Sequence, residues 1–134
     1  MSCVLRIGGE ELDADALLNR VTLPAYRVDR KGNPRPIRSR GVFEASTIHI
    51  DVSGAGFAGL PTQVADAITF LGANADAVRT AVLFPGVGYA TLDFAVESKD
   101  VAIDSSYFPP DLLRRAGELG VGIELSVYPR AKAR

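Results

Sequence analysis

The sequence predicts an α+β fold: a largely antiparallel sheet with helices on one face and ferredoxin-like character. Two patterns predict it. Several segments alternate apolar and polar residues, as strands do when one face is buried, and amphipathic helical segments lie between them. Read along the chain, the order is strand, helix, strand, helix, two strands, helix and strand. With 134 residues, the chain suits one domain covering 1–134.

The first strand is predicted over residues 3–7, where apolar and polar side chains alternate. A helix follows. Asp13 is a good N-cap residue, and Leu12 and Leu17 stand at the spacing of a hydrophobic staple. Pro24 marks the far limit of this helix, because proline removes an amide that a helix needs.

The middle of the chain predicts three more strands and a second helix. Residues 42–52 alternate at their end, and Pro61 begins a helix that runs to about Asn74. Residues 80–84 and 89–96 then predict a hairpin, followed by a short extended piece at 101–103.

The last elements have the clearest boundaries. Pro110 suits a first helical turn, Asp111 lies where the helix dipole favours an anion, and Gly120 can end the helix. Residues 121–128 alternate as a half-buried strand.

Composition limits the classes of function. Hydrophobic residues make up 47% of the chain and charged residues 23%, as in globular proteins. One cysteine and one histidine exclude an internal disulfide and the usual zinc clusters, so no structural metal is expected. No cofactor is expected either. No apolar run approaches the ~20 residues of a membrane span. The expected location is the cytoplasm, without membrane contact.

A basic segment stands out in a chain whose formal net charge is −1. Residues 26–40 are predicted to form a flexible loop or hairpin arm with a local net charge of +5. Its cations are Arg27, Arg30, Lys31, Arg35, Arg38 and Arg40, against the single acid Asp29. Such a cluster suits phosphate, nucleic acid or an acidic protein. Because Tyr26 is its only aromatic partner, it favours an acidic protein over nucleic acid. Residues 130–134 are expected to be a frayed end.

Strand parity places ten polar side chains on the sheet face that the helices leave uncovered. They are Arg6, Thr47, His49, Asp51, Tyr89, Thr91, Asp93, Glu124, Ser126 and Tyr128. This face is the best candidate binding surface. His49 beside Asp51 or Asp93 would be the minimum for general acid-base catalysis, although a solvated sheet face needs no function to explain it.

A second motif, Gly54-x-Gly56-x-x-Gly59, resembles the dinucleotide-binding fingerprint, whose glycines let backbone amides hold a pyrophosphate. Against it, Pro61 would fall past the first turn of a helix that began inside the motif. The next predicted strand does not end on an acid, and the 75 residues after Gly59 are too few for a two-halved Rossmann sheet.

Three features carry a resemblance that extends over most of the chain: the N-terminal Val-Leu-Arg-Ile-Gly-Gly-Glu-Glu-Leu-Asp segment, the Lys31-Gly32 loop and the C-terminal Phe-Pro-Pro-Asp-Leu-Leu to Val-Tyr128 segment. In these features the chain resembles the bacterial domain-of-unknown-function family 4279. That family has a tryptophan in its second strand where Phe43 is the nearest aromatic residue here. The resemblance implies a small bacterial α+β domain and carries no catalytic residues.

The sequence therefore predicts a non-catalytic protein-binding module, of the immunity type or as a homodimer, using the open sheet face or the basic arm. The alternative is a nucleotide- or flavin-binding protein that uses the loop from Gly54 to Gly59. A third hypothesis is an enzyme that works through His49.

Overall fold

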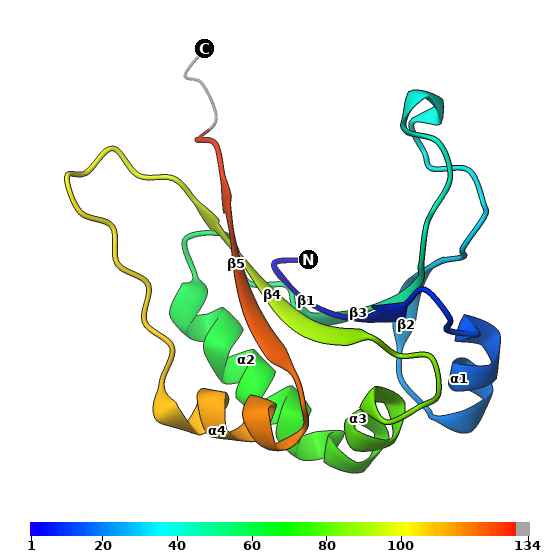
Figure 1. Cartoon of the computed structure of the whole chain (residues 1–134). Coiled ribbons are helices and arrows are strands. Elements are labelled where there is room, and N and C mark those ends of the chain that lie inside the picture. Colours follow the sequence, from blue (N-terminus) through cyan, green and yellow to red (C-terminus); the bar gives the residue numbers. More distant parts are fainter. Residues whose placement is uncertain (131–134) are drawn as a thin grey trace.

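A computed structural model describes residues 1–130 of the chain (Figure 1). The strands are β1 (Cys3–Gly9), β2 (Ala25–Asp29), β3 (Ser46–Ser53), β4 (Tyr89–Glu97) and β5 (Gly122–Tyr128). The helices are α1 (Ala14–Arg20), α2 (Leu60–Ala73), α3 (Ala75–Val82) and α4 (Pro110–Glu118), with a short 3-10 turn, η1 (Arg38–Arg40). The predicted frayed tail falls largely on 131–134, outside the described residues.

The five strands form one sheet in the order β2-β3-β1-β4-β5. β1 lies in the middle and runs antiparallel to β3 and β4, β2 is antiparallel to β3, and only β4 and β5 are parallel. β3 and β4 therefore run the same way with β1 between them, joined through α2 and α3. This is the split β-α-β arrangement of ferredoxin-like folds, and the predicted α+β class is confirmed.

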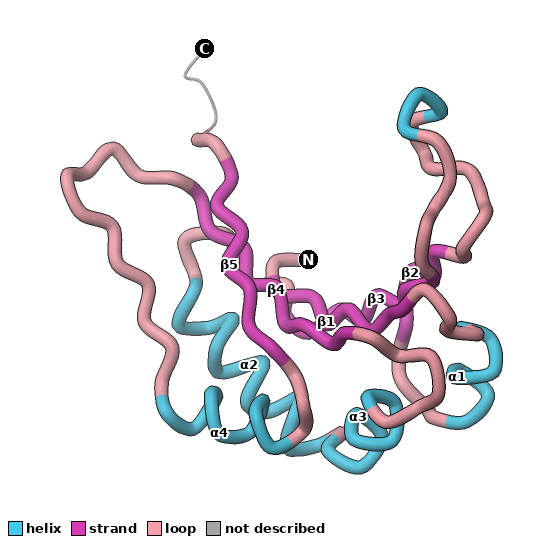
Figure 2. The backbone as a smooth tube through the Cα atoms, in the orientation of Figure 1, coloured by secondary structure: helices cyan, strands magenta, loops and turns pink. Residues whose placement is uncertain are grey.

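The helices all lie on one side of the sheet (Figure 2). The sheet face toward them is apolar: Leu5, Ile7 and Ile50 are fully buried, as are Leu92 and Phe94. The helices contribute their own buried stripes. The buried apolar residues of the helices include Leu17, Val64, Leu71, Val78 and Leu112. Burial of this shared core holds the two layers together.

The predicted helix signals act as expected. The Asp13 carboxylate accepts a hydrogen bond of 3.1 Å from the Ala16 amide and caps α1. α4 begins at Pro110, and Gly120 follows it at φ +76°, a conformation that glycine adopts without strain. The Val121 amide then donates to the Ala116 carbonyl, which closes the helix end.

The hairpin predicted over 80–84 and 89–96 is wrong. Residues 75–82 form helix α3, in which Val78 and Ala81 are buried three residues apart. The run Thr80 to Phe84 is apolar after its first residue and was predicted as a short strand, but it is the end of a helix and the turn after it. Packing of Val78 and Ala81 on the core decided the outcome over the local pattern.

Three other boundaries differ from prediction. The segment 26–40 is not all loop, because residues 25–29 form the edge strand β2. β3 begins at Ser46, so residues 42–45 belong to the arm before it. No strand forms at 101–103, which lie in the loop between β4 and α4.

The segment 30–45 is a projecting arm. Pro34 and Val42 pair as an antiparallel bridge, and the Gly32 amide donates to the Phe43 carbonyl at 2.8 Å. The arm leaves the sheet on the side opposite the helices (Figure 1). Toward the other edge, β5 and the C-terminal part of β4 rise on this same side (Figure 2). The uncovered sheet face thus lies between two raised flanks.

Candidate functional site

The uncovered face carries the polar side chains that strand parity predicted to share it. Strand pairing places Arg6 beside both His49 and Thr91, and Asp93 beside Glu124. No second layer of the described chain covers them (Figure 1). This face of the sheet is therefore open to solvent. Thr47, His49 and Asp93 are nevertheless buried, because neighbouring side chains on the same face cover them.

One cluster on this face links β1, β4 and β5. The Arg6 guanidinium forms an ion pair of 2.5 Å with Asp93 Oδ2, and Ser126 Oγ donates to Asp93 Oδ1 at 2.6 Å. Both carboxylate oxygens of the buried Asp93 are thus occupied. Burial would lower the pKa of Arg6, but the hydrogen bond and charge of Asp93 raise it above its ordinary value.

A second cluster links β2 and β3 and corrects the predicted histidine pair. His49 Nε2 lies 2.8 Å from Asp29 Oδ2, and the Arg27 guanidinium holds the same carboxylate at 2.8 and 3.2 Å. His49 therefore pairs with neither Asp51 nor Asp93. Because β2 was predicted as loop, nothing in the sequence placed Asp29 beside His49.

The His49 side chain is buried from solvent and hydrogen-bonded to Asp29. Burial lowers its pKa below the ordinary value, although the Asp29 carboxylate acts in the opposite direction. Burial would raise the pKa of Asp29, but hydrogen bonds from Arg27 and His49 hold it below its usual range. The Tyr26 ring stands beside the imidazole at 6.1 Å between centroids. This arrangement fixes the imidazole in the surface.

A third contact crosses the central strand. The hydroxyls of Thr47 on β3 and Tyr89 on β4 lie 2.5 Å apart, directly over Gly8 of β1. A Cβ at Gly8 would lie 2.5 Å from the tyrosine hydroxyl. Glycine at this position therefore lets two flanking strands join over the middle one.

Asp51, Glu124 and Tyr128 complete the predicted face in different ways. Asp51 and Glu124 are exposed and form no hydrogen bond or ion pair within residues 1–130. Tyr128 lies at the strand end, where its ring stacks on Phe57 at 5.2 Å and 13°. Tyr128 thus belongs to the end of the sheet and contacts the loop that leads to α2.

Four of the six cations in the basic segment have partners. Arg27 pairs with Asp29, and Arg30 forms a two-pronged pair with Asp15 of α1. Lys31 Nζ donates to the Glu10 carbonyl. Arg35 donates to the Val42 carbonyl, and its guanidinium lies 5.1 Å from the Phe43 ring centroid.

The other two cations, Arg38 and Arg40, lie in η1 at the tip of the arm. Both are exposed and have no hydrogen-bond or ion-pair partner among the described residues. Ile37 beside them is 57% exposed. At the base of the arm, a hollow of about 720 Å³ is bordered by Arg35 and Glu44 of the arm, by Glu10 and Glu11, and by Thr47 and Tyr89 of the sheet.

The glycine loop lies at the end of the sheet where β3, β4 and β5 all finish. A Cβ at Gly54 or Gly56 would meet no atom within 4 Å, and neither glycine has a positive φ, so neither is required by the local backbone. Gly59 is the N-cap of α2, and the helix begins after the motif. The buried Gln63 side chain donates to the Gly56 carbonyl and to Ala95 of β4, which ties the loop to the sheet.

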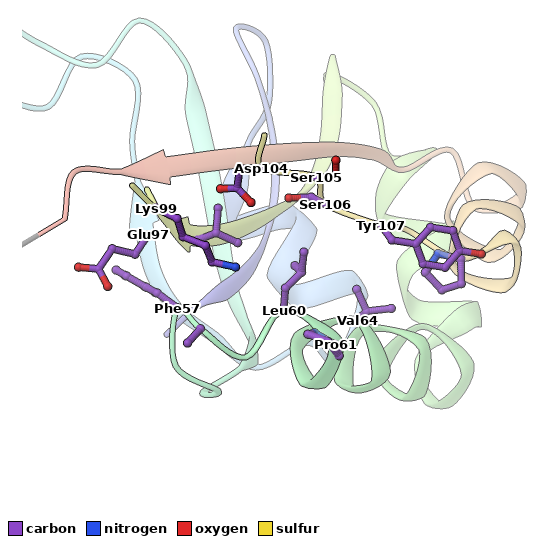
Figure 3. A pocket seen from close by; sticks show the side chains of 13 residues that line it. Phe57, Leu60, Pro61, Val64, Glu97, Lys99, Asp104, Ser105, Ser106 and Tyr107 are labelled. Carbon is purple, nitrogen blue, oxygen red and sulfur yellow. The ribbon is translucent and has the colours of Figure 1, made fainter. Parts of the chain in front are cut away.

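This loop borders a cavity of about 560 Å³ (Figure 3). Leu60 and Val64 of α2 point into it from below, and the Lys99 ammonium enters from the end of β4. Residues 104–107 of the loop before α4 form its outer wall. The cavity thus has an apolar floor and one cation, with serine and aspartate on its rim.

No protein-family model matches the chain, and no curated protein or solved structure is significantly similar to it. The resemblance to family 4279 therefore stays a prediction. Within residues 1–130, no helix is long and apolar enough to cross a membrane. The same residues contain no group of three or more His, Cys, Asp or Glu side chains able to hold a metal ion.

Proposed function

We propose that this protein is a non-catalytic binding module that holds an acidic protein partner between the basic arm and the open sheet face, as an immunity-type protein would. The observation that carries the proposal is the tip of the arm, where Arg38 and Arg40 project beside the exposed Ile37 and have no partner in the part of the chain that the structure describes. Four neighbouring cations are neutralised or hydrogen-bonded, so these two keep their full capacity for an external carboxylate.

The surface below the tip supports a protein ligand. Tyr26 and Tyr89 are 44% and 42% exposed on the same face, and the Arg27 side chain is about half exposed. Tyrosine and arginine are the residue types most enriched at protein interfaces. The ion pairs of Arg6 and Arg27 hold the charged side chains in place before binding, which reduces the entropy cost of association.

The distribution of charge indicates which kind of partner would bind. The arm is basic while the whole chain has a formal net charge of −1. An acidic partner would therefore be steered to the arm, and the encounter should weaken as salt rises. A partner loop with Asp or Glu next to an apolar residue would match both the arginines and Ile37.

The test is capture of a partner from source-cell lysate with the wild-type protein and with Arg38→Glu/Arg40→Glu. Arg20→Glu/Arg79→Glu is the matched control, because it changes the net charge equally on α1 and α3. We expect a specific partner to be retained by wild type and control and lost from the arm variant, with salt-sensitive affinity for the purified partner. Equal retention by the arm variant would contradict the proposal.

The cavity favours a second candidate function, binding of a nucleotide or flavin. Its volume of about 560 Å³ lies in the range typical of small-molecule sites, and it adjoins the first turn of α2. Lys99 is the cation in position to meet a phosphate, and the face of the Phe57 ring that does not stack on Tyr128 is the aromatic surface available to a ligand ring. Gly59 and Pro61 limit the free amides that the helix start can offer.

Native mass spectrometry of freshly purified protein tests this candidate, followed by thermal melting with added nucleotides and flavins. Retained nucleotide, or a melting shift lost in Val64→Trp and kept in Arg38→Glu/Arg40→Glu, would support it. An unliganded mass and unchanged melting with every nucleotide and flavin would exclude it.

A further inference from the structure

The outer edge of β5 is an unprotected place for another strand to pair. Among residues 1–130, β5 ends the sheet and has a neighbouring strand on one side only. It is seven residues long, pairs with β4 without a bulge, and contains no proline and a single charge, Glu124. Natural proteins usually protect such edges with bulges, prolines, lysines or short strands.

The hydrogen-bonding groups that face outward can be identified. The Ser98 amide donates to the Tyr128 carbonyl at 2.8 Å, so Tyr128 directs its backbone groups toward β4. Since these groups alternate in direction along a strand, Ile123, Leu125 and Val127 direct theirs away from β4. Their backbone N–H and C=O groups form a row that another strand could pair with.

The side chains of these three residues point to the helix side, but the helix layer does not fully cover them. Ile123 and Leu125 are half-buried, and Val127 is 57% exposed. The loop that leads to α4 leaves the end of β4 and runs outward past β5 (Figure 1). That loop and α4 also carry exposed apolar side chains: Val101, Ile103, Tyr107 and Leu113. A strand paired with β5 would therefore also cover apolar surface.

The sequence of β5 suits pairing with itself. If two copies pair antiparallel about a twofold axis at Leu125, Leu125 faces Leu125 of the other copy and Ile123 faces Val127. The outward backbone groups of these residues then meet as hydrogen-bonded pairs. On the other face Glu124 lies opposite Ser126, so no two carboxylates are directly opposed. An axis at Glu124 would oppose two carboxylates and turn the inward-bonded groups toward the partner.

We propose that the protein forms a twofold-symmetric homodimer through antiparallel pairing of β5 with β5, centred on Leu125. The two five-stranded sheets then form one ten-stranded sheet, as expected for an isologous interface. The two open faces become one surface with a basic arm at each far end. This interface is separate from the proposed partner site, and either can exist without the other.

The first test is the mass in solution, measured by light scattering over a range of concentrations. Wild type should approach twice 14.2 kDa. Val127→Lys should remain monomeric, because it places a charge on each side of the new pairing. Ile37→Lys is the matched control: Ile37 is also 57% exposed, but it lies on the arm, so this variant should still dimerise. A monomeric wild type, or a dimer unaffected by Val127→Lys, would overturn the proposal.

The second test fixes the register and does not depend on the lysine variant. Glu124→Cys/Ser126→Cys should give a covalent dimer on mild oxidation, because paired residues without mutual hydrogen bonds have Cα atoms about 4.5 Å apart. Each single variant faces a non-cysteine residue in this register and should stay unlinked. Burial and nearby carboxylates raise the pKa of the native Cys3 thiol to about 12, so it will not compete. Equal linking by either single variant, or none by the double variant, would contradict the register.

Discussion

The two edges of the sheet are built differently. β2 has five residues, follows Pro24, contains an irregularity between Ala25 and Arg27, and is held by charged contacts to β3. β5 has seven residues, pairs regularly and has apolar side chains at its border. The β2 edge has the features that prevent strand addition, and the β5 edge lacks them.

We therefore propose different binding partners for the two halves of the molecule. The β2 half carries the arm, and its ion pairs reach α1 through Arg30 and Asp15. The β5 half offers backbone groups and apolar surface. A partner recognised by charge suits the first half, and a copy of the same chain suits the second.

The largest expected effect comes from the central strand, whose position fixes both edges. A Cβ on Gly9 would lie 2.0 Å from the Gly86 carbonyl oxygen, so Gly9→Ala must displace backbone. We expect a loss of about 3 kcal/mol in the free energy of unfolding, measured by urea denaturation. Gly54→Ala is the control, since its Cβ would meet open space. Equal stability of the two variants would show that the close approach is not rigid.

Asp29→Ala tests the charged contacts of the β2 edge. It leaves the buried His49 and the half-exposed Arg27 without their shared carboxylate. The expected loss is about 2 kcal/mol, together with faster amide exchange in β2 than in β5. Uniform acceleration in both strands would mean that these contacts do not act on β2 in particular.

Ser126→Ala makes the corresponding change at the other half of the sheet. It removes the hydroxyl that donates to Asp93 but leaves the Arg6 pair in place. We expect a smaller loss of about 1 kcal/mol, by the same denaturation experiment. If Ser126→Ala lowered the free energy of unfolding more than Asp29→Ala does, the Asp93 cluster would contribute more to stability than the Asp29 cluster, contrary to this expectation.

The smallest expected effect is a dependence of the free energy of unfolding on pH, caused by His49 and Asp29 in the β2 half. His49 has a pKa below its ordinary 6.5 in the folded protein, so the unfolded chain binds the proton first as the pH falls. Stability should therefore decline as the pH drops below about 6.5. The lowered pKa of Asp29 adds a further decline, below its ordinary value of 3.8. In His49→Gln, the decline between about pH 7 and 5 should shrink; an unchanged profile would assign it to other groups.

The elements with strong end signals were predictable, and the others were not. Asp13, Pro61, Pro110 and Gly120 mark boundaries through local backbone chemistry, which the structure confirms. The strand predicted at 80–84 was wrong because a short apolar run fits a strand or a helix equally well, and burial of Val78 and Ala81 favoured a helix there. β2 had too few alternating residues to stand out within a basic segment.

Strand parity predicted which polar side chains share the open face, because side chains alternate strictly along a strand. It could not predict their partners. The contact of His49 with Asp29 depends on which strand lies beside β3, and strand order is a tertiary property. The cavity was also out of reach, since it joins α2, β4 and a loop distant in sequence.

Amide hydrogen exchange as a function of protein concentration tests the contrast between the two edges most directly. We expect the amides of Ile123, Leu125 and Val127 to be protected in concentrated solution and to exchange rapidly on dilution. The amides of β2 should exchange at rates that do not depend on concentration. Concentration-independent exchange at these three residues, or a concentration effect confined to β2, would contradict the account.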